Sequence, residues 1–218
     1  MFDLGSDFLP TFIARAVVLL IAFTIHELSH AVTADYLGDS TARRLGRVTL
    51  NPLAHLDPVG TLMLLLAGFG WAKPVPVNPY NLRGNPRTGM AVVAAAGPLS
   101  NLMMASLAIV PLRFGWLGAL PFNTGRVLPS LDFLLFEFIW INLVLAFFNL
   151  IPIVPLDGSK ILLGLLPANL AYSLRPLEQY GPILLLVVVF LLPQLGVDVL
   201  GPIVIAPSQW LFRLMVGV

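Results

Sequence analysis

The stretch His26-Glu-Leu-Ser-His30 (HELSH) lies inside an apolar run, residues 11–37, that is long enough to cross a lipid bilayer as a helix. On a helix, the pattern HExxH places two imidazoles one turn apart on one face, with a carboxylate beside them. This arrangement can hold zinc and activate a bound water. Burying ionisable side chains at membrane depth costs at least about 2.5–3.5 kcal/mol each, so a chance occurrence is disfavoured. The stretch therefore predicts a membrane helix that carries part of a metal site.

The composition is that of an integral membrane protein. Of the 218 residues, 58% are hydrophobic and 11% are charged, and the mean hydropathy is +0.91; soluble domains carry roughly 25% charged residues. The formal net charge of +1 argues against nucleic acid as a partner. The chain has no cysteine, so any metal must be held by His, Asp or Glu. No charge run or low-complexity stretch marks a boundary, and we expect a single integral-membrane domain over residues 1–218.

Apolar runs predict an all-α polytopic membrane protein with about five to six membrane segments. The full-length spans are expected at residues 11–37, 88–112 and 131–151. Residues 59–71 are apolar but too short to span, and alternating prolines follow at 74, 76 and 79, so we expect a re-entrant hairpin there. After a break come a short helix at residues 159–166 and accessory membrane segments at 178–192 and 199–216.

The basic residues predict the orientation of the chain. Six of them fall between the first two full spans: Arg43, Arg44, Arg47, Lys73, Arg83 and Arg87. If the short segment re-enters, all six lie on one face, which the positive-inside rule makes cytoplasmic. We therefore expect a multi-pass protein of the cell (inner or plasma) membrane with its N-terminus outside. HELSH lies about ten residues from the inner end of its helix, or ~15 Å deep, nearer the cytoplasmic side.

HELSH supplies only two ligands, whereas a zinc ion with an open position for water takes three from the protein. The spacings of soluble zinc proteases fail here. No Glu lies on a nearby following helix, and Thr33 and Tyr36 occupy the Gly and third His positions of HExxHxxGxxH. The chain has three histidines and few acidic residues, and the remaining candidates are His55, Asp57, Glu137 and Asp157.

Among these candidates, Asp157 lies in a stretch that Pro152 and Pro155 break after the third full span. Broken helices at membrane depth commonly build ion sites, because the break frees backbone groups and turns side chains inward. Spacing alone leaves the four candidates open.

Three motifs follow one another along the chain: HELSH at 26–30, Ala-Gly-Pro-Leu-Ser-Asn at 96–101 and Asn-Leu-Ile-Pro-Ile-Val-Pro-Leu-Asp-Gly at 149–158. Together they resemble the site-2 protease family of intramembrane zinc metalloproteases. The stretches at 53–58 and 71–79 resemble its compact prokaryotic members, which carry no PDZ or nucleotide-sensing domain. The likeness covers about residues 20 to 165, most of the chain.

The resemblance implies that His26, His30 and Asp157 bind one Zn²⁺ per chain and that Glu27 is the catalytic base. It implies a three-helix catalytic core, which we expect at about residues 11–166, with the metal nearer the cytosolic side. It also implies a transmembrane protein or peptide as substrate, cut in or near its membrane segment in regulated intramembrane proteolysis. The natural substrate and the oligomeric state are left unassigned.

Two further residues are candidate substrate contacts. Asn149 is a candidate for substrate or oxyanion contact, with a helix-capping or interhelical amide as the alternative. His55 is a candidate for assisting the metal or substrate, although a lone loop histidine is more often structural. The extended segment at residues 75–78 is a candidate edge for pairing with an unwound substrate by β-augmentation.

Two other function classes compete with proteolysis. One is a catalytically silent membrane scaffold or chaperone of the same fold, which has no need of buried ionisable groups. The other is a metal-binding carrier that transports the ion. A His pair on one helix with an adjacent carboxylate base favours hydrolysis over both.

Overall fold

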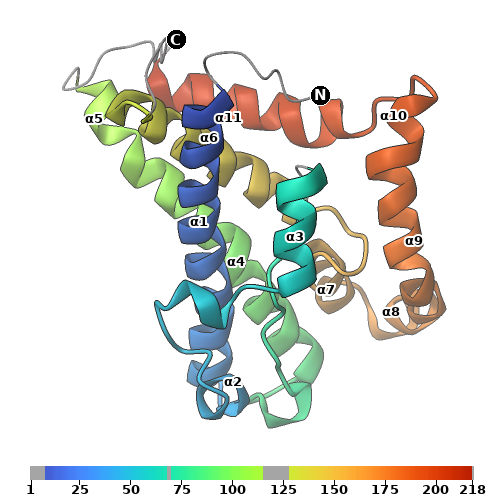
Figure 1. Cartoon of the computed structure of the whole chain (residues 1–218). Coiled ribbons are helices and arrows are strands. Elements are labelled where there is room, and N and C mark those ends of the chain that lie inside the picture. Colours follow the sequence, from blue (N-terminus) through green and yellow to red (C-terminus); the bar gives the residue numbers. More distant parts are fainter. Residues whose placement is uncertain (1–7, 68–69, 115–127, 218) are drawn as a thin grey trace.

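The computed structural model describes residues 8–67, 70–114 and 128–217, and this part of the chain is mostly helical (Figure 1). Four helical runs in it are long and apolar enough to cross a membrane: Phe8–Tyr36, Pro86–Arg113, Leu131–Asn149 and Ala168–Gln194. Within the described ranges there is no β-strand, only an isolated antiparallel bridge between Leu56 and Ala72. The prediction of an all-α polytopic membrane protein is confirmed.

The α-helices are α1 (Phe8–Tyr36), α2 (Thr41–Arg44), α3 (Pro58–Ala67), α4 (Pro86–Ala108), α5 (Val110–Arg113), α6 (Leu131–Asn149), α7 (Asp157–Leu165), α8 (Ala168–Leu174), α9 (Gly181–Leu186), α10 (Leu192–Gln194) and α11 (Ala206–Val216). The 3-10 turns are η1 (Pro52–Ala54), η2 (Pro79–Asn81) and η3 (Arg175–Tyr180), and the π-helical turns are η4 (Val187–Leu191) and η5 (Gly201–Ile205).

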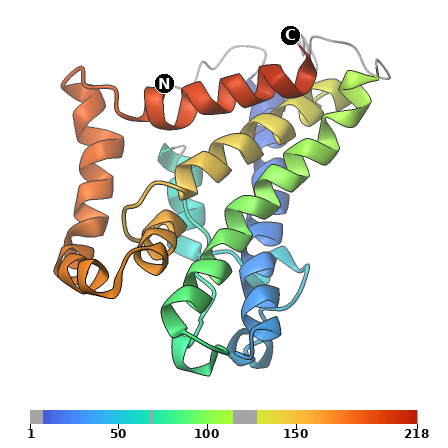
Figure 2. The same ribbon diagram turned by 180° about the vertical axis from the view of Figure 1, so that it is seen from behind.

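Helices α1, α4 and α6 pack against one another as a three-helix core, and α7 packs on α4 (Figures 1 and 2). Small side chains line the contacts: Ala22 and Ala31 of α1 and Ala105 of α4 are fully buried. In a membrane, such small residues let helix backbones approach closely where larger side chains would hold them apart. The close packing encloses several polar groups of these helices, among them His26, His30 and Asn101.

The helix ends that set the position of α7 follow from local sequence. Helix α6 ends at Asn149, and Pro152 and Pro155 cannot continue it, because proline lacks the N–H that a helix interior needs. Asp157 is the first residue of α7 and therefore stands at the helix N-terminus created by this break.

The hairpin expected after the first span is present. Helix α3 leads to an extended return segment, where the Lys73 N–H donates to the His55 carbonyl at 2.8 Å next to the Leu56–Ala72 bridge. The chain therefore leaves and returns beside the same loop.

Asp39 ties the end of α1 to the segment that follows the hairpin. Its fully buried carboxylate accepts hydrogen bonds from the Thr41 hydroxyl (2.6 Å), the Asn78 backbone N–H (2.7 Å) and the Asn81 amide (2.9 Å). Burial by itself would raise the pKa of Asp39, but these donors outweigh it and hold the pKa below its ordinary value. Asp39 therefore stays ionised at neutral pH and anchors the 78–81 turn beside α1.

The C-terminal part forms one long helical run and one shorter one in the region of the two expected accessory membrane segments. The segment expected at residues 178–192 is part of the longer helical run Ala168–Gln194. The segment expected at 199–216 is a shorter run, η5 and α11, below the ~20 residues that crossing requires. It lies across the end of the bundle against α6 (Figures 1 and 2).

Candidate metal centre

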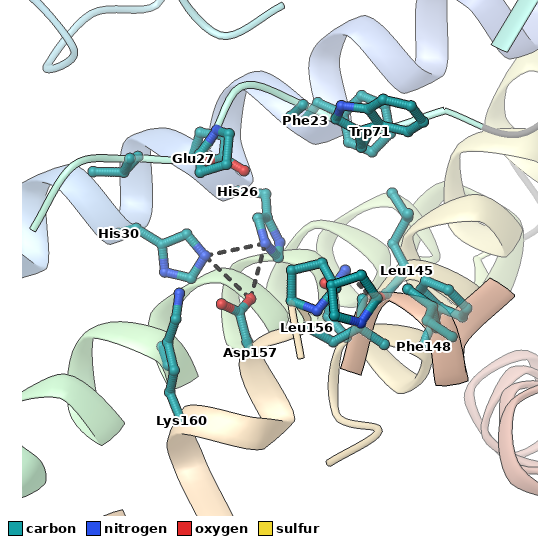
Figure 3. Close-up of a pocket in the computed structure, with 18 of the residues that line it drawn as sticks. Phe23, His26, Glu27, His30, Trp71, Leu145, Phe148, Leu156, Asp157 and Lys160 are labelled. Atoms are coloured by element: carbon teal, nitrogen blue, oxygen red, sulfur yellow. Dashed lines mark hydrogen bonds and ion pairs between the residues drawn. The ribbon is translucent and has the colours of Figure 1, made fainter. Parts of the chain in front are cut away.

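Three buried side chains from α1 and α7 converge on one point (Figure 3). The Nε2 atoms of His26 and His30 lie 3.1 Å apart, and each lies 3.2 Å from Oδ2 of Asp157. The two histidines share a helix face through their i, i+4 spacing, and the break after α6 brings Asp157 to them.

The remaining ring nitrogens show which atoms carry protons. His26 Nδ1 lies 2.6 Å from Oδ1 of Asn101, and His30 Nδ1 lies 2.7 Å from the carbonyl oxygen of Val93. Both partners are acceptors, so each Nδ1 donates and each neutral imidazole presents a lone pair at Nε2. Oδ2 of Asp157 is buried without a hydrogen-bond partner. Three acceptor atoms thus face one another.

This donor set fits a zinc ion. Zinc bonds of about 2.0–2.2 Å in a tetrahedral site place the ligand atoms about 3.3 Å from one another, close to the three separations found here. Two imidazolium rings at such a distance would repel each other, whereas a cation satisfies all three lone pairs. His26, His30 and Asp157 could therefore hold a metal ion and leave a fourth position for water.

Gly97 of α4 lies directly against the imidazoles of His26 and His30. A Cβ atom at residue 97 would lie 2.5 Å from both His26 Cε1 and His30 Nε2. No side chain fits there without displacing the imidazoles, so α4 reaches this close to α1 only because residue 97 is glycine.

A cavity of about 650 Å³ opens beside the three side chains. Glu27, Asn149 and Lys160 line it together with them. The extended return segment of the hairpin and the helical run that contains α9 and η4 both contribute to the lining. Their lining residues are Trp71, Ala72, Pro74, Val75, Val77, Pro182, Leu185, Leu186, Val189 and Phe190. The cavity is therefore mainly apolar, with its polar groups gathered at the metal-binding end.

The other candidates for a third ligand lie elsewhere. His55 is fully buried in its loop, with Nε2 2.9 Å from the Thr49 carbonyl, and does not line the cavity. Asp57 accepts from the Gly60 N–H at the start of α3. Glu137 pairs with Arg15 across α1 and α6, with Nε and Oε2 3.1 Å apart. Of the four candidates, the structure brings only Asp157 to the two histidines.

Two residues that sequence reasoning passed over stand near the site. Lys160, one turn after Asp157 on α7, points toward His30 and Asp157 in Figure 3; its i, i+3 spacing from Asp157 was the available signal. Asn142 is fully buried in α6. An amide within the apolar stretch of residues 138–148 was its signal, since such a group needs a partner.

Comparison with known proteins identifies the family. The profile described as Peptidase family M50 matches residues 125–192. A protein described as a candidate zinc metalloprotease, YwhC of Bacillus subtilis, is 42% identical over 202 residues, which cover 91% of this chain and 89% of YwhC. The chain belongs to peptidase family M50. This membership confirms the resemblance to the site-2 protease family and makes the protein a membrane metalloprotease.

Other M50 relatives carry similar descriptions. The candidate zinc metalloprotease Rip2 of Mycobacterium tuberculosis strain H37Rv is 31% identical, over 89% of this chain and 71% of its own length. The candidate zinc metalloprotease MJ0611 of Methanocaldococcus jannaschii is 29% identical, over 69% of this chain and 70% of its own length. No solved structure matches the chain. These M50 findings and the donor set of the site together support Zn²⁺ as the cofactor.

Proposed function

We propose that the protein is an intramembrane zinc endopeptidase that hydrolyses peptide bonds in or near the transmembrane segments of membrane proteins. In this proposal His26, His30 and Asp157 hold the zinc, and Glu27 is the general base. The supporting observation is that the ligand atoms of His26, His30 and Asp157 converge beside a cavity. This cavity lies among helices that are long and apolar enough to span a membrane.

In this reaction zinc would activate the water, and side chains of the protein would transfer the proton and contact the substrate. A zinc ion held there would lower the pKa of a bound water to about 7 and would polarise the scissile carbonyl. Glu27, which lines the cavity beside His26, accepts a proton from the attacking water and returns it to the leaving amine. Asn149 also lines the cavity; one hydrogen of its amide goes to the Leu145 carbonyl at 3.0 Å, and the other is available to a substrate carbonyl.

The experiment that tests this function uses the purified full chain in detergent. We expect about one zinc per chain, cleavage of a panel of transmembrane peptides, loss of cleavage after chelation and recovery when zinc is returned. Zinc-free protein that cleaves would contradict the metal assignment. Zinc-loaded protein that cleaves nothing, but moves zinc into sealed vesicles, would favour the carrier; one that does neither would favour the scaffold.

The extended return segment offers the substrate a backbone edge. The N–H groups of Val75 and Val77 make no hydrogen bond to the described residues, and both residues line the cavity. Residues two apart on an extended chain present their N–H groups to the same side. A substrate helix that unwinds in the cavity can therefore pair with this edge by β-augmentation.

Arg47 holds this edge in place. Its guanidinium donates to the carbonyls of Lys73 (2.6 Å) and Pro74 (2.9 Å). Burial lowers the pKa of Arg47 from its ordinary value, and the negative charge of Glu27 counteracts the shift. Arg47 therefore fixes the substrate edge from a position where its charge is felt by the proposed base.

Val77→Pro removes one N–H from the edge while keeping the backbone extended. We expect cleavage of transmembrane peptides to fall about 10-fold, which corresponds to the loss of one hydrogen bond of ~1.4 kcal/mol. Zinc content stays at the wild-type level, since Val77 is not one of the three convergent metal-binding residues. Val77→Ala, which keeps the N–H, is the control. Equal rates for Val77→Pro and Val77→Ala would argue against pairing.

We propose that the protein lies in the cell membrane with the α2 end on the cytoplasmic side, the metal site nearer that side and the N-terminus outside. Exposed basic residues gather around α2 and the hairpin, in support of this orientation: Arg43, Arg44, Lys73 and Arg83. Because the chain has no cysteine, Arg43→Cys introduces a single thiol. Labelling of that thiol by an impermeant reagent added to intact cells would contradict the orientation.

A further inference from the structure

Two buried amides connect His26 to a helix that contributes no metal ligand. Nδ1 of His26 lies 2.6 Å from Oδ1 of Asn101 on α4. Nδ2 of Asn101 donates to Oδ1 of Asn142 on α6 at 2.8 Å, and Nδ2 of Asn142 donates to the Phe138 carbonyl at 2.8 Å. Asn101 and Asn142 are both fully buried. The hydrogen bonds form one unbroken chain across α1, α4 and α6.

The direction of this chain is set at its far end. The Phe138 carbonyl can only accept, so the amide of Asn142 turns its nitrogen toward it and its oxygen toward Asn101. Asn101 must then donate to Asn142, which leaves the Asn101 oxygen facing His26. Flipping either amide would set two donors or two acceptors against each other in a buried place, which is costly.

We propose that Asn101 and Asn142 are positioning residues that hold His26 in the tautomer with hydrogen on Nδ1, so that Nε2 is available to zinc. His30 gets the same constraint directly from a backbone carbonyl, that of Val93. For His26 the constraint passes through side chains and can be removed by mutation. The inference rests on the proposed zinc site.

The packing of these apolar helices does not by itself require a hydrogen-bonded series that reaches His26. An amide in an apolar span must find a partner among neighbouring helices, and one Asn–Asn pair across α4 and α6 would already satisfy that need. The extension to His26 links the pair to the site. Partners that orient a ligating histidine typically contribute 10–100-fold to metal affinity.

The test measures zinc affinity of the full chain in detergent by competition with a chelator, together with the unfolding temperature of the zinc-free proteins. Asn101→Leu removes the acceptor, and we expect zinc affinity to fall about 10–100-fold. Asn101→Asp keeps an oxygen facing Nδ1, and we expect it to bind zinc within a few-fold of wild type. Asn142→Leu leaves the Asn101 amide without a fixed direction, and we expect an intermediate loss of about 3–10-fold.

Ser100→Ala is the matched control, because it removes a buried hydrogen bond of α4, to the Gly97 carbonyl, without touching His26. If Asn101→Leu weakens zinc binding no more than Ser100→Ala does, the two amides only pack and the inference is overturned. If Asn101→Leu does not fold, Asn142→Leu decides: zinc affinity equal to that of wild type overturns the inference. Failure of wild type to bind zinc would instead overturn the proposed function.

Discussion

Glu27→Gln is expected to cleave transmembrane peptides about 10²–10⁴-fold more slowly than wild type while keeping its zinc. Glutamine has nearly the same shape as glutamate, but its amide cannot accept the proton of the attacking water. Glu27 is buried, lines the cavity and is not one of the three convergent ligand atoms, so its loss removes proton transfer and spares metal binding. The measurement is the single-turnover cleavage rate beside the zinc content of the same preparation.

The matched control for this prediction is Asp35→Asn on the same helix. It makes the same carboxylate-to-amide change at an ion pair with Arg43, 2.7 Å long, outside the cavity. We expect its cleavage rate to stay within about two-fold of wild type, since a partly exposed pair of this kind contributes little. Equal cleavage by wild type and Glu27→Gln would refute the role of Glu27 as base.

Gly97→Ala is expected to lower zinc affinity by on the order of 100-fold or more, with a matching loss of cleavage. The added methyl would lie 2.5 Å from His30 Nε2 and 2.6 Å from His26 Nε2, the two nitrogens that face the metal. Both rings are held by hydrogen bonds at Nδ1 and packed in the core, so neither can move aside without losing its bond. Alanine is otherwise the better helix former, so α4 itself does not weaken.

Gly89→Ala on the same helix is the control for the added methyl. There the nearest atoms would be Cδ1 of Leu82 at 2.9 Å and Cβ of Leu82 at 3.1 Å, so the added methyl crowds Leu82 and no metal-binding side chain. We expect Gly89→Ala to bind zinc as wild type does. Zinc affinity that is equal in Gly97→Ala and Gly89→Ala would show that zinc binding does not need the two imidazoles where they lie against residue 97. Binding is measured by chelator competition, with helix content checked by circular dichroism.

Much of the fold could be predicted because membrane helices have strong local signals. The apolar runs at 11–37, 88–112 and 131–151 correspond to α1, α4 and α6 within a few residues at each end. The prolines at 152 and 155 marked the break before α7 for a reason that needs no tertiary contact. Apolar composition did not give the placement of the run at 199–216, because it does not distinguish a helix that crosses the bilayer from one lying across the bundle end.

The candidate site, like the fold, could be predicted from the sequence only in part. The pairing of His26 with His30 was determined by sequence alone, since the 3.6-residue period places i and i+4 on one helix face wherever the helix lies. From the residues alone, four candidates for the third ligand stayed open, and the family resemblance favoured Asp157. The meeting of Asp157 with the two histidines was decided by tertiary structure, through the packing of α7 on α4. So was the alignment of Asn101 and Asn142 behind His26. The physical reason is the distance along the sequence over which each effect acts. Helix periodicity and proline geometry act over a few residues and can be predicted from the sequence. Contacts between distant residues depend instead on how closely Gly97 and its small neighbours let the helices approach.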